Sequence, residues 1–180
     1  MISPVLTTRR LILRPITLDD ADEITRGLGN WEVVQWLTTP PFPYSRNDAI
    51  HFITATIPGT TTWAIDAGDG LIGVIGVKPD LGYWLDAEFH GQHIMTEAVQ
   101  AVIKWYFTNC DAPLASGYLV GNRASCAILE KLGFVNTILQ TQIHTATQDS
   151  VTLQCMELTH EHWQVKYAEL AIPLPVGKMT

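Results

Sequence analysis

The chain has 180 residues, of which 47% are hydrophobic and 16% are charged, and this composition is typical of globular domains rather than disordered, collagenous or coiled-coil chains. Eleven Lys and Arg residues against 18 Asp and Glu residues give a formal net charge of -7, with no cluster of cations. This pattern argues against nucleic acid as a direct partner, because phosphate neutralisation requires clustered cations. We expect one domain over residues 1–180, a length that a single hydrophobic core can serve.

No membrane span or secretory signal is expected. The longest apolar run near the middle of the chain covers residues 71–77, far short of the roughly 20 residues that cross a bilayer. The first ten residues lead into no long apolar region and no small-residue cleavage site. Cys110, Cys126 and Cys155 are odd in number and widely spaced, which predicts reduced thiols rather than a disulfide framework or a zinc site. We therefore expect a cytoplasmic protein without a bound metal.

The amino-terminal third predicts one strand and two helices. Residues 10–16 are a short β-rich run. Thr17 then resembles the cap of an amphipathic helix that ends at residues 29–30. Ser45, with an acid three residues later, resembles the cap of a second helix that closes at Pro58-Gly59.

The middle of the chain predicts a hairpin, a strand and a long helix. Residues 61–66 and 71–77 are strand-like and are separated by a Gly-containing loop, and residues 81–86 read as a further strand. The apolar residues that follow at helical spacing are Met95, Ala98, Val99, Val102, Ile103 and Tyr106. A strand is expected next, over residues 114–119.

Asn122 is well placed to cap a further helix, which should end at Gly133 in a left-handed conformation. The remaining expected segments are a pair of strands over residues 134–140 and 151–158, a helix over residues 159–170, and an extended tail over residues 171–180. The order of these elements predicts a fold of mixed α and β type.

The most informative unit is the loop that enters the helix, at residues 88–98. The start of a helix presents unpaired N–H groups and the positive end of the helix dipole, and such a place suits a phosphate. A single glycine there, Gly91, is a weak signal by itself. On the residues alone, an ordinary tight turn is the more frequent explanation.

Three spaced motifs add to that signal. They are residues 6–15, residues 82–85 with Gly91-Gln92 and Thr96-Glu97-Ala98, and residues 122–125 through 129–134. In this order they resemble the GNAT acetyltransferase superfamily, most closely the branch of the Rim-type ribosomal-protein N-terminal acetyltransferases, over about residues 6–158. The resemblance implies an α/β (α+β) fold, with a mixed, largely antiparallel sheet of six or seven strands and helices on both faces. It also implies acetyl-CoA as donor and a primary amine as acceptor.

The resemblance implies the following cofactor contacts. The pyrophosphate of CoA would lie on the backbone of Gly91, Gln92, His93, Ile94, Met95 and Thr96. The pantetheine arm would pair with the backbone of Trp84 and Leu85, where the strand splays from its neighbour, and Asn122 would contact CoA. On the residues alone, Asn122 is a helix cap.

Ser125 follows Asn122 in an N-x-x-S pattern, and the resemblance implies that its hydroxyl bonds the leaving sulfur of CoA. The general base is open among Asp86, Glu88 and Glu32, with Asp86 placed directly after the splayed strand. For each of these acids a solvated surface role is the alternative. The aromatic residues of the half in which this family builds its acceptor cleft are Trp31, Trp36, Tyr44 and Trp63.

Two positions depart from the superfamily's loop pattern. His93 stands where the second glycine is usual, and Met95 stands where a small residue is usual. A non-catalytic relative that senses CoA or binds a protein is therefore the alternative to an N-acetyltransferase. Direct transfer is expected, because no cysteine occupies a matched catalytic position. The acceptor is open between a peptide amino terminus and a small molecule, and the oligomeric state is open, with a homodimer among the alternatives.

Overall fold

A single sheet of eight strands forms the centre of the protein, seen in a computed structural model that describes residues 3–56 and 61–171. In spatial order the strands are β1 (Leu6–Thr7), β2 (Ile12–Pro15), β3 (Thr61–Asp66), β4 (Leu71–Val77), β5 (Leu81–Leu85), β6 (Leu114–Leu119), β8 (Ser150–Leu158) and β7 (Val135–Ile143). Every neighbouring pair is antiparallel except β5 and β6. The predicted mixed, largely antiparallel sheet is confirmed, and its eighth strand is the two-residue β1, too short to leave a pattern in the sequence.

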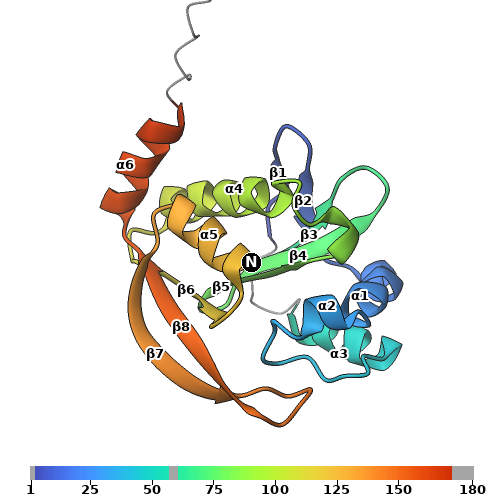
Figure 1. Cartoon of the computed structure of the whole chain (residues 1–180). Coiled ribbons are helices and arrows are strands. Elements are labelled where there is room, and N and C mark those ends of the chain that lie inside the picture. Colours follow the sequence, from blue (N-terminus) through green and yellow to red (C-terminus); the bar gives the residue numbers. More distant parts are fainter. Residues whose placement is uncertain (1–2, 57–60, 172–180) are drawn as a thin grey trace, which may run out of the picture.

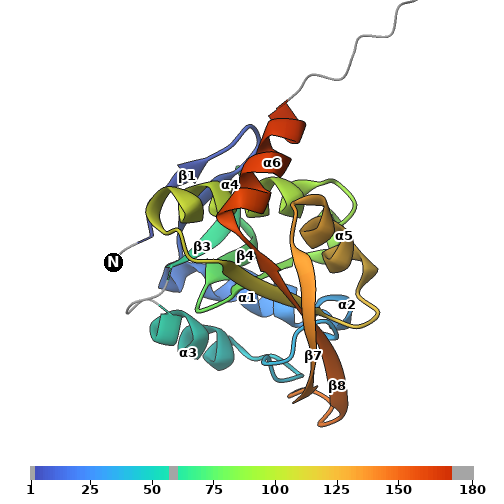
Figure 2. The same cartoon turned by 90° about the vertical axis from the view of Figure 1, so that its left-hand side faces the viewer.

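Helices cover both faces of this sheet (Figure 1). One side carries the 3-10 turn η1 (Leu18–Asp20) and the helices α1 (Ala21–Leu28), α2 (Trp31–Val34) and α3 (Arg46–Thr56). The other side carries α4 (Ile94–Asn109) and α5 (Arg123–Lys131), with α6 (His160–Ala171) beyond them, and the 3-10 turn η2 (Ala87–Phe89) follows β5. Each side buries its own apolar cluster against the sheet. Strands β7 and β8 form a long hairpin at one edge (Figure 2).

Most of the expected helix ends are confirmed. Thr17 and Asp20 form a capping box before α1, and the backbone N–H of Ser45 donates to Asp48 before α3. Gly133 follows α5 with φ +96, the left-handed conformation expected for it. The expected close at Pro58-Gly59 lies outside the described residues. The expected tail is corrected at its first residue, since Ala171 is the last residue of α6, and residues 172–180 are also outside the described part.

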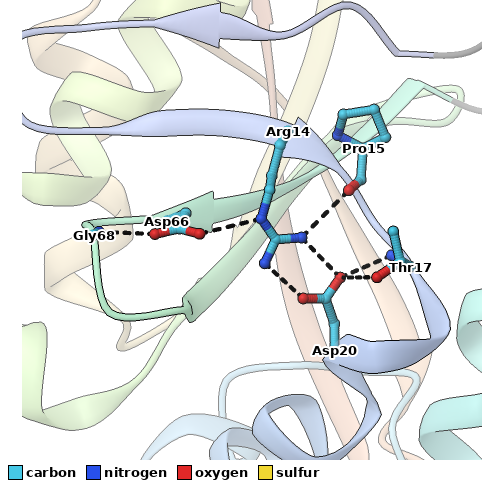
Figure 3. Close-up of polar contacts among 6 residues, drawn as sticks. All are labelled: Arg14, Pro15, Thr17, Asp20, Asp66 and Gly68. Atoms are coloured by element: carbon cyan, nitrogen blue, oxygen red, sulfur yellow. Dashed lines mark hydrogen bonds and ion pairs between the residues drawn. The ribbon is translucent and has the colours of Figure 1, made fainter.

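A cluster around Arg14 of β2 ties the start of α1 to the sheet (Figure 3). Its guanidinium donates to both carboxylate oxygens of Asp20, at 2.7 and 3.0 Å, and to Asp66 at the end of β3, at 3.1 Å. The Asp20 carboxylate also accepts from the Thr17 N–H at 2.7 Å. Asp20 is 4% exposed, so this ring of hydrogen bonds satisfies a carboxylate that burial would otherwise penalise. Because α1 leads directly into α2, the cluster also positions the helix that lines the site described next.

Trp84 of β5 fixes the opposite end of α1. Its side chain lies in the cluster beneath α1, and its ring packs so closely on Gly27 that a Cβ at that position would lie 2.5 Å from it. Gly27 therefore allows a close approach of helix and strand that alanine does not.

Candidate active site

The site begins where two neighbouring strands separate. Strand β5 pairs with β6 only at Leu81 and Ser116, where the Ser116 hydroxyl also donates to the Leu81 carbonyl at 2.9 Å. Beyond this point the register records no pairing between the two strands. The expected splay is therefore confirmed, and it opens a gap in the middle of the sheet.

The backbone of β5 alternates between its two neighbours. The N–H of Asp86 donates to the carbonyl of Ile72 in β4. The backbone N–H and C=O groups of Trp84 and Asp86 therefore point toward β4, whereas those of Tyr83 and Leu85 point toward the gap. The Leu85 carbonyl accepts from the His90 ring at 2.9 Å. The groups open to an added strand are thus the N–H and C=O of Tyr83 and the N–H of Leu85. The Leu85 N–H is free, as the expected pairing at Leu85 requires. The backbone of Trp84 faces Val74 of β4 instead, and the free residue next to Leu85 along the gap is Tyr83.

The first turn of α4 points its free amides into the same region. The first intrahelical bond runs from the Glu97 N–H to the His93 carbonyl, and no side chain caps the helix, so the N–H groups of residues 94–96 have no partner within it. Gly91 has φ +73, and His93 at the cap has φ 59 and ψ 13. His93 therefore adopts the left-handed conformation that glycine adopts without strain. The loop keeps a glycine-type backbone at this position.

The amino-terminal motif holds this loop in place. Glu97, in the first turn of α4, accepts hydrogen bonds from the Thr8 hydroxyl at 2.6 Å and from the Arg10 guanidinium at 2.8 Å. Arg10 also donates to the Gln92 carbonyl at 3.0 Å. Burial opposes the effect, but the hydrogen bonds from Thr8 and Arg10 keep the pKa of Glu97 below its usual value. Two motifs far apart in the sequence thus meet at the loop.

The start of α5 lies across the gap. The Asn122 side chain accepts from the Ser125 N–H at 3.1 Å, so the cap expected from the sequence is confirmed. The Ser125 hydroxyl lies 2.8 Å from the Tyr83 hydroxyl of β5. Burial raises the pKa of Tyr83 to about 12, although the hydrogen bond with Ser125 acts in the opposite direction. The phenol is therefore neutral at physiological pH.

These elements surround a cavity of about 570 Å³. The predicted site residues that line it are Trp84, Leu85, Gly91, His93, Ile94, Met95, Thr96, Asn122 and Ser125. Gln92 and Asp86 do not line it. The Gln92 side chain instead donates to the Glu88 carbonyl at 3.0 Å. The structure thus brings together most of the residues that the motifs indicated.

The three acids considered as general base occupy different places. Asp86 is 8% exposed and lies 3.5 Å from the Arg26 guanidinium of α1, on the side of the sheet that carries Trp84. Glu88 is exposed in η2 and does not line the cavity. Glu32 of α2 does line it. Of the three, only Glu32 lines the cavity.

Among the aromatic residues of the amino-terminal half, Trp36 lines the cavity and Trp63 is fully buried in the core. Sequence reasoning missed Tyr83 as a site residue. The available signal was the alternation of side chains along the strand. The Tyr83 side chain lies on the same face as Leu81 and Leu85, and this face packs against α4 and α5, which carry the expected site residues.

The described ranges 3–56 and 61–171 contain neither a metal-ligand cluster nor a membrane-spanning helix. No group of three or more His, Cys, Asp or Glu side chains gathers there as ligands for a metal ion. Nor does that part of the chain contain a helix with the length and apolarity that a membrane crossing requires.

Known structures share this fold. MccE, a microcin C7 self-immunity acetyltransferase solved with acetyl-CoA and AMP, is 18% identical, with a TM-score of 0.74 over 84% of this chain and 93% of that one. RimL, a ribosomal L7/L12 α-N-protein acetyltransferase solved with coenzyme A, is 20% identical, with a TM-score of 0.75 over 87% of this chain and 98% of that one. A GNAT-family acetyltransferase from Bacillus anthracis is 15% identical, with a TM-score of 0.77 over 88% of this chain and 99% of that one.

The sequence itself identifies the family. No sequence among curated proteins matches the chain significantly. The profile described as the acetyltransferase (GNAT) domain matches residues 10–135, which is well over half of the chain and spans β2 to the start of β7. Together with the splayed strands and the uncapped start of α4, this match shows that the chain belongs to the GNAT acetyltransferase family.

Proposed function

We propose that the protein transfers the acetyl group of acetyl-CoA directly to a primary amine. The observation that carries this proposal is the hydrogen-bonded pair of Tyr83 and Ser125, which faces the cavity from both sides of the gap between β5 and β6. A hydrogen-bonded hydroxyl pair, which has one free O–H donor, suits a reaction in which negative charge develops on a leaving sulfur.

The cavity fits the donor in three respects. The free backbone of Tyr83 and Leu85 accommodates an arm of amide groups as an added strand. The unpartnered amides at the start of α4 suit a pyrophosphate, which the helix dipole also favours. The left-handed backbone at His93 preserves the path that a glycine would give this loop, which supports retained CoA binding.

In the proposed step the lone pair of the neutral amine forms a bond to the thioester carbon, and the carbon–sulfur bond breaks. The electron pair of that bond leaves on sulfur, and the amine nitrogen gives up a proton to solvent or to a carboxylate. The bond between the Tyr83 and Ser125 hydroxyls uses one of their two protons, and the other proton is free to form a hydrogen bond toward the sulfur. The start of α5 adds the positive end of its dipole. No cysteine of the described residues lines the cavity, which favours direct transfer over an acetyl-enzyme.

The experiment that tests the proposal measures thiol release from acetyl-CoA with a panel of primary amines and peptide amino termini. Thiol release that depends on an amine, together with an acetylated product identified by mass spectrometry, supports the enzyme. CoA binding without release for any member of the panel supports the non-catalytic alternative.

A further inference from the structure

One wall of the cavity comes from α2 and the residues that follow it, which the transfer step does not use. Helical hydrogen bonds continue past α2, with the Gln35 N–H donating to Trp31 at 3.1 Å and the Trp36 N–H donating to Val33 at 3.2 Å. Glu32 and Trp36 are four residues apart on this turn and share one face. Both residues line the cavity, so an acidic and an aromatic residue are neighbours in its wall.

Within the described part of the chain, the Glu32 carboxylate has no partner. It forms no hydrogen bond and no ion pair with the side chains or backbone of residues 3–56 and 61–171. It is also the one carboxylate among the described residues that line the cavity. Asp86, by contrast, is paired with Arg26 outside the cavity. An unpaired anion at the wall of an apolar cavity is a place for a cation.

Trp36 connects this anion to the reacting end of the cavity. Its ring packs over the turn at Gly121, where a Cβ would lie 3.7 Å from it. Asn122 follows that turn and caps the helix that carries Ser125. An electron-rich indole face attracts ammonium groups, and it does so more strongly where water is excluded. A cation at Glu32 and Trp36 would therefore lie near the turn that leads into α5, the helix that carries Ser125.

We propose that Glu32 and Trp36 form the ammonium subsite for the acceptor, and that the acceptor is a primary alkyl- or arylalkylamine with no carboxylate beside its nitrogen. This inference rests on the proposed acetyl transfer. Val33 and Leu37 of the same wall supply apolar surface for the body of the acceptor. A free amino acid is disfavoured because its carboxylate would face Glu32, and like charges in one cavity repel. A peptide amino terminus has an amide in place of that carboxylate, so it shares the recognised chemistry with a small amine.

The first test measures cation binding without turnover. The probe is phenethyltrimethylammonium, which carries the charge but cannot be acetylated, titrated calorimetrically into the protein with CoA present. Glu32→Gln should lower its affinity about fivefold, the size of a partly exposed charge pair. Trp36→Leu should lower it about threefold to fivefold, as the loss of a cation–π contact does. The matched control is Glu161→Gln, an exposed acid on α6, which should bind like the wild type. Equal affinity in the wild type and Glu32→Gln, or no binding to either, overturns the proposal.

The second test compares acceptors that differ only beside the nitrogen. We expect kcat/KM to be high for phenethylamine and phenylalaninamide and low for phenylalanine, and Glu32→Gln should shrink that difference. A preference for the amide over the amine indicates a peptide amino terminus as the source of the ammonium group, and the reverse indicates a small molecule. Preference for phenylalanine overturns the subsite. Cation binding that depends on Glu32, without turnover of any amine, contradicts the transferase and leaves the subsite standing.

Discussion

The Tyr83 hydroxyl lies 2.8 Å from the Ser125 Oγ, so one hydrogen bond joins strand β5 to helix α5 across the gap in the sheet. With the pKa of Tyr83 raised to about 12, the pair is a much weaker acid than an alkyl thiol, whose pKa is about 8.5. Complete proton transfer to a leaving thiolate is therefore uphill. The pair stabilises the thiolate by hydrogen bonding, and solvent protonates it afterwards.

Replacing Ser125 by alanine should lower turnover more than it lowers CoA affinity, because the hydroxyl acts on charge that develops only in the transition state. We expect kcat to fall about tenfold to a hundredfold, with the dissociation constant of CoA changed less than about threefold. Steady-state kinetics and calorimetry measure the two quantities. Unchanged turnover would reject the role of Ser125.

Tyr83→Phe separates the phenol from its aromatic ring. If Tyr83 acts through Ser125, its removal should lower kcat in the wild-type background and have little effect in Ser125→Ala, since residues in direct contact are not additive. The measurement is a double-mutant cycle on kcat. Fully additive losses would show that the two hydroxyls act separately.

The conformation of His93 gives a prediction about stability. A left-handed residue with a side chain costs roughly 1 to 2 kcal/mol relative to glycine, whereas alanine is the better residue at right-handed positions. His93→Gly should therefore unfold in urea at a higher concentration than His93→Ala, by about 1 kcal/mol in free energy of unfolding. The opposite order would indicate a right-handed start of α4.

Gly27 gives a second prediction about packing. Alanine in place of glycine usually stabilises a helix by about 1 kcal/mol. Here the new methyl group would lie 2.5 Å from the Trp84 ring, and overpacking a fitted core typically costs about 1 to 3 kcal/mol. We expect the cost of overpacking to exceed the gain in helix stability, so that Gly27→Ala lowers the free energy of unfolding. Gly82→Ala, where a Cβ would meet no atom within 4 Å, serves as a comparison without a clash. A more stable Gly27→Ala protein would contradict the close approach of α1 and β5.

The Arg14 cluster makes stability depend on pH in a defined direction. Burial opposes the shift, but hydrogen bonds from the Gly68 N–H and from Arg14 lower the pKa of Asp66. A carboxyl whose folded pKa lies below its unfolded pKa of about 3.9 adds stability above that value and loses it as the pH falls through the folded pKa. Asp66→Asn should lower the free energy of unfolding by about 1 kcal/mol at pH 7 and by less near pH 3. Asp19→Asn, an exposed acid of the η1 turn, is the control. An equal loss at both pH values for Asp66→Asn would contradict this linkage.

The parts of the fold that follow from local chemistry could be predicted from the sequence. The caps at Thr17, Ser45 and Asn122 and the left-handed Gly133 all depend on residues within one turn of the chain. Strand β1 and helix α2 could not be predicted in this way, because two or four residues are too short to show a period.

The residues of the candidate site also differ in whether a local sequence signal could reveal them. The loop and the N-x-x-S pattern are contiguous motifs, so the sequence revealed Gly91, Asn122 and Ser125. Tyr83 and Glu32 take their places from the splay of β5 and from the packing of α2, which are relationships between distant segments. Sequence alone therefore could not show that Glu32, rather than Asp86, is the acid that lines the cavity. The partner of Asp86, Arg26, is apparent only in the fold.

The most direct test of the proposed direct transfer follows the acetyl group in a single turnover. The protein is mixed with acetyl-CoA, first alone and then with phenethylamine, and both its intact mass and the released thiol are recorded. We predict no thiol release and no change of mass without the amine, followed by one thiol and one acetylated amine for each acetyl-CoA consumed. Thiol release without amine together with an acetylated protein, or binding of acetyl-CoA with no release under either condition, would contradict direct transfer by this site.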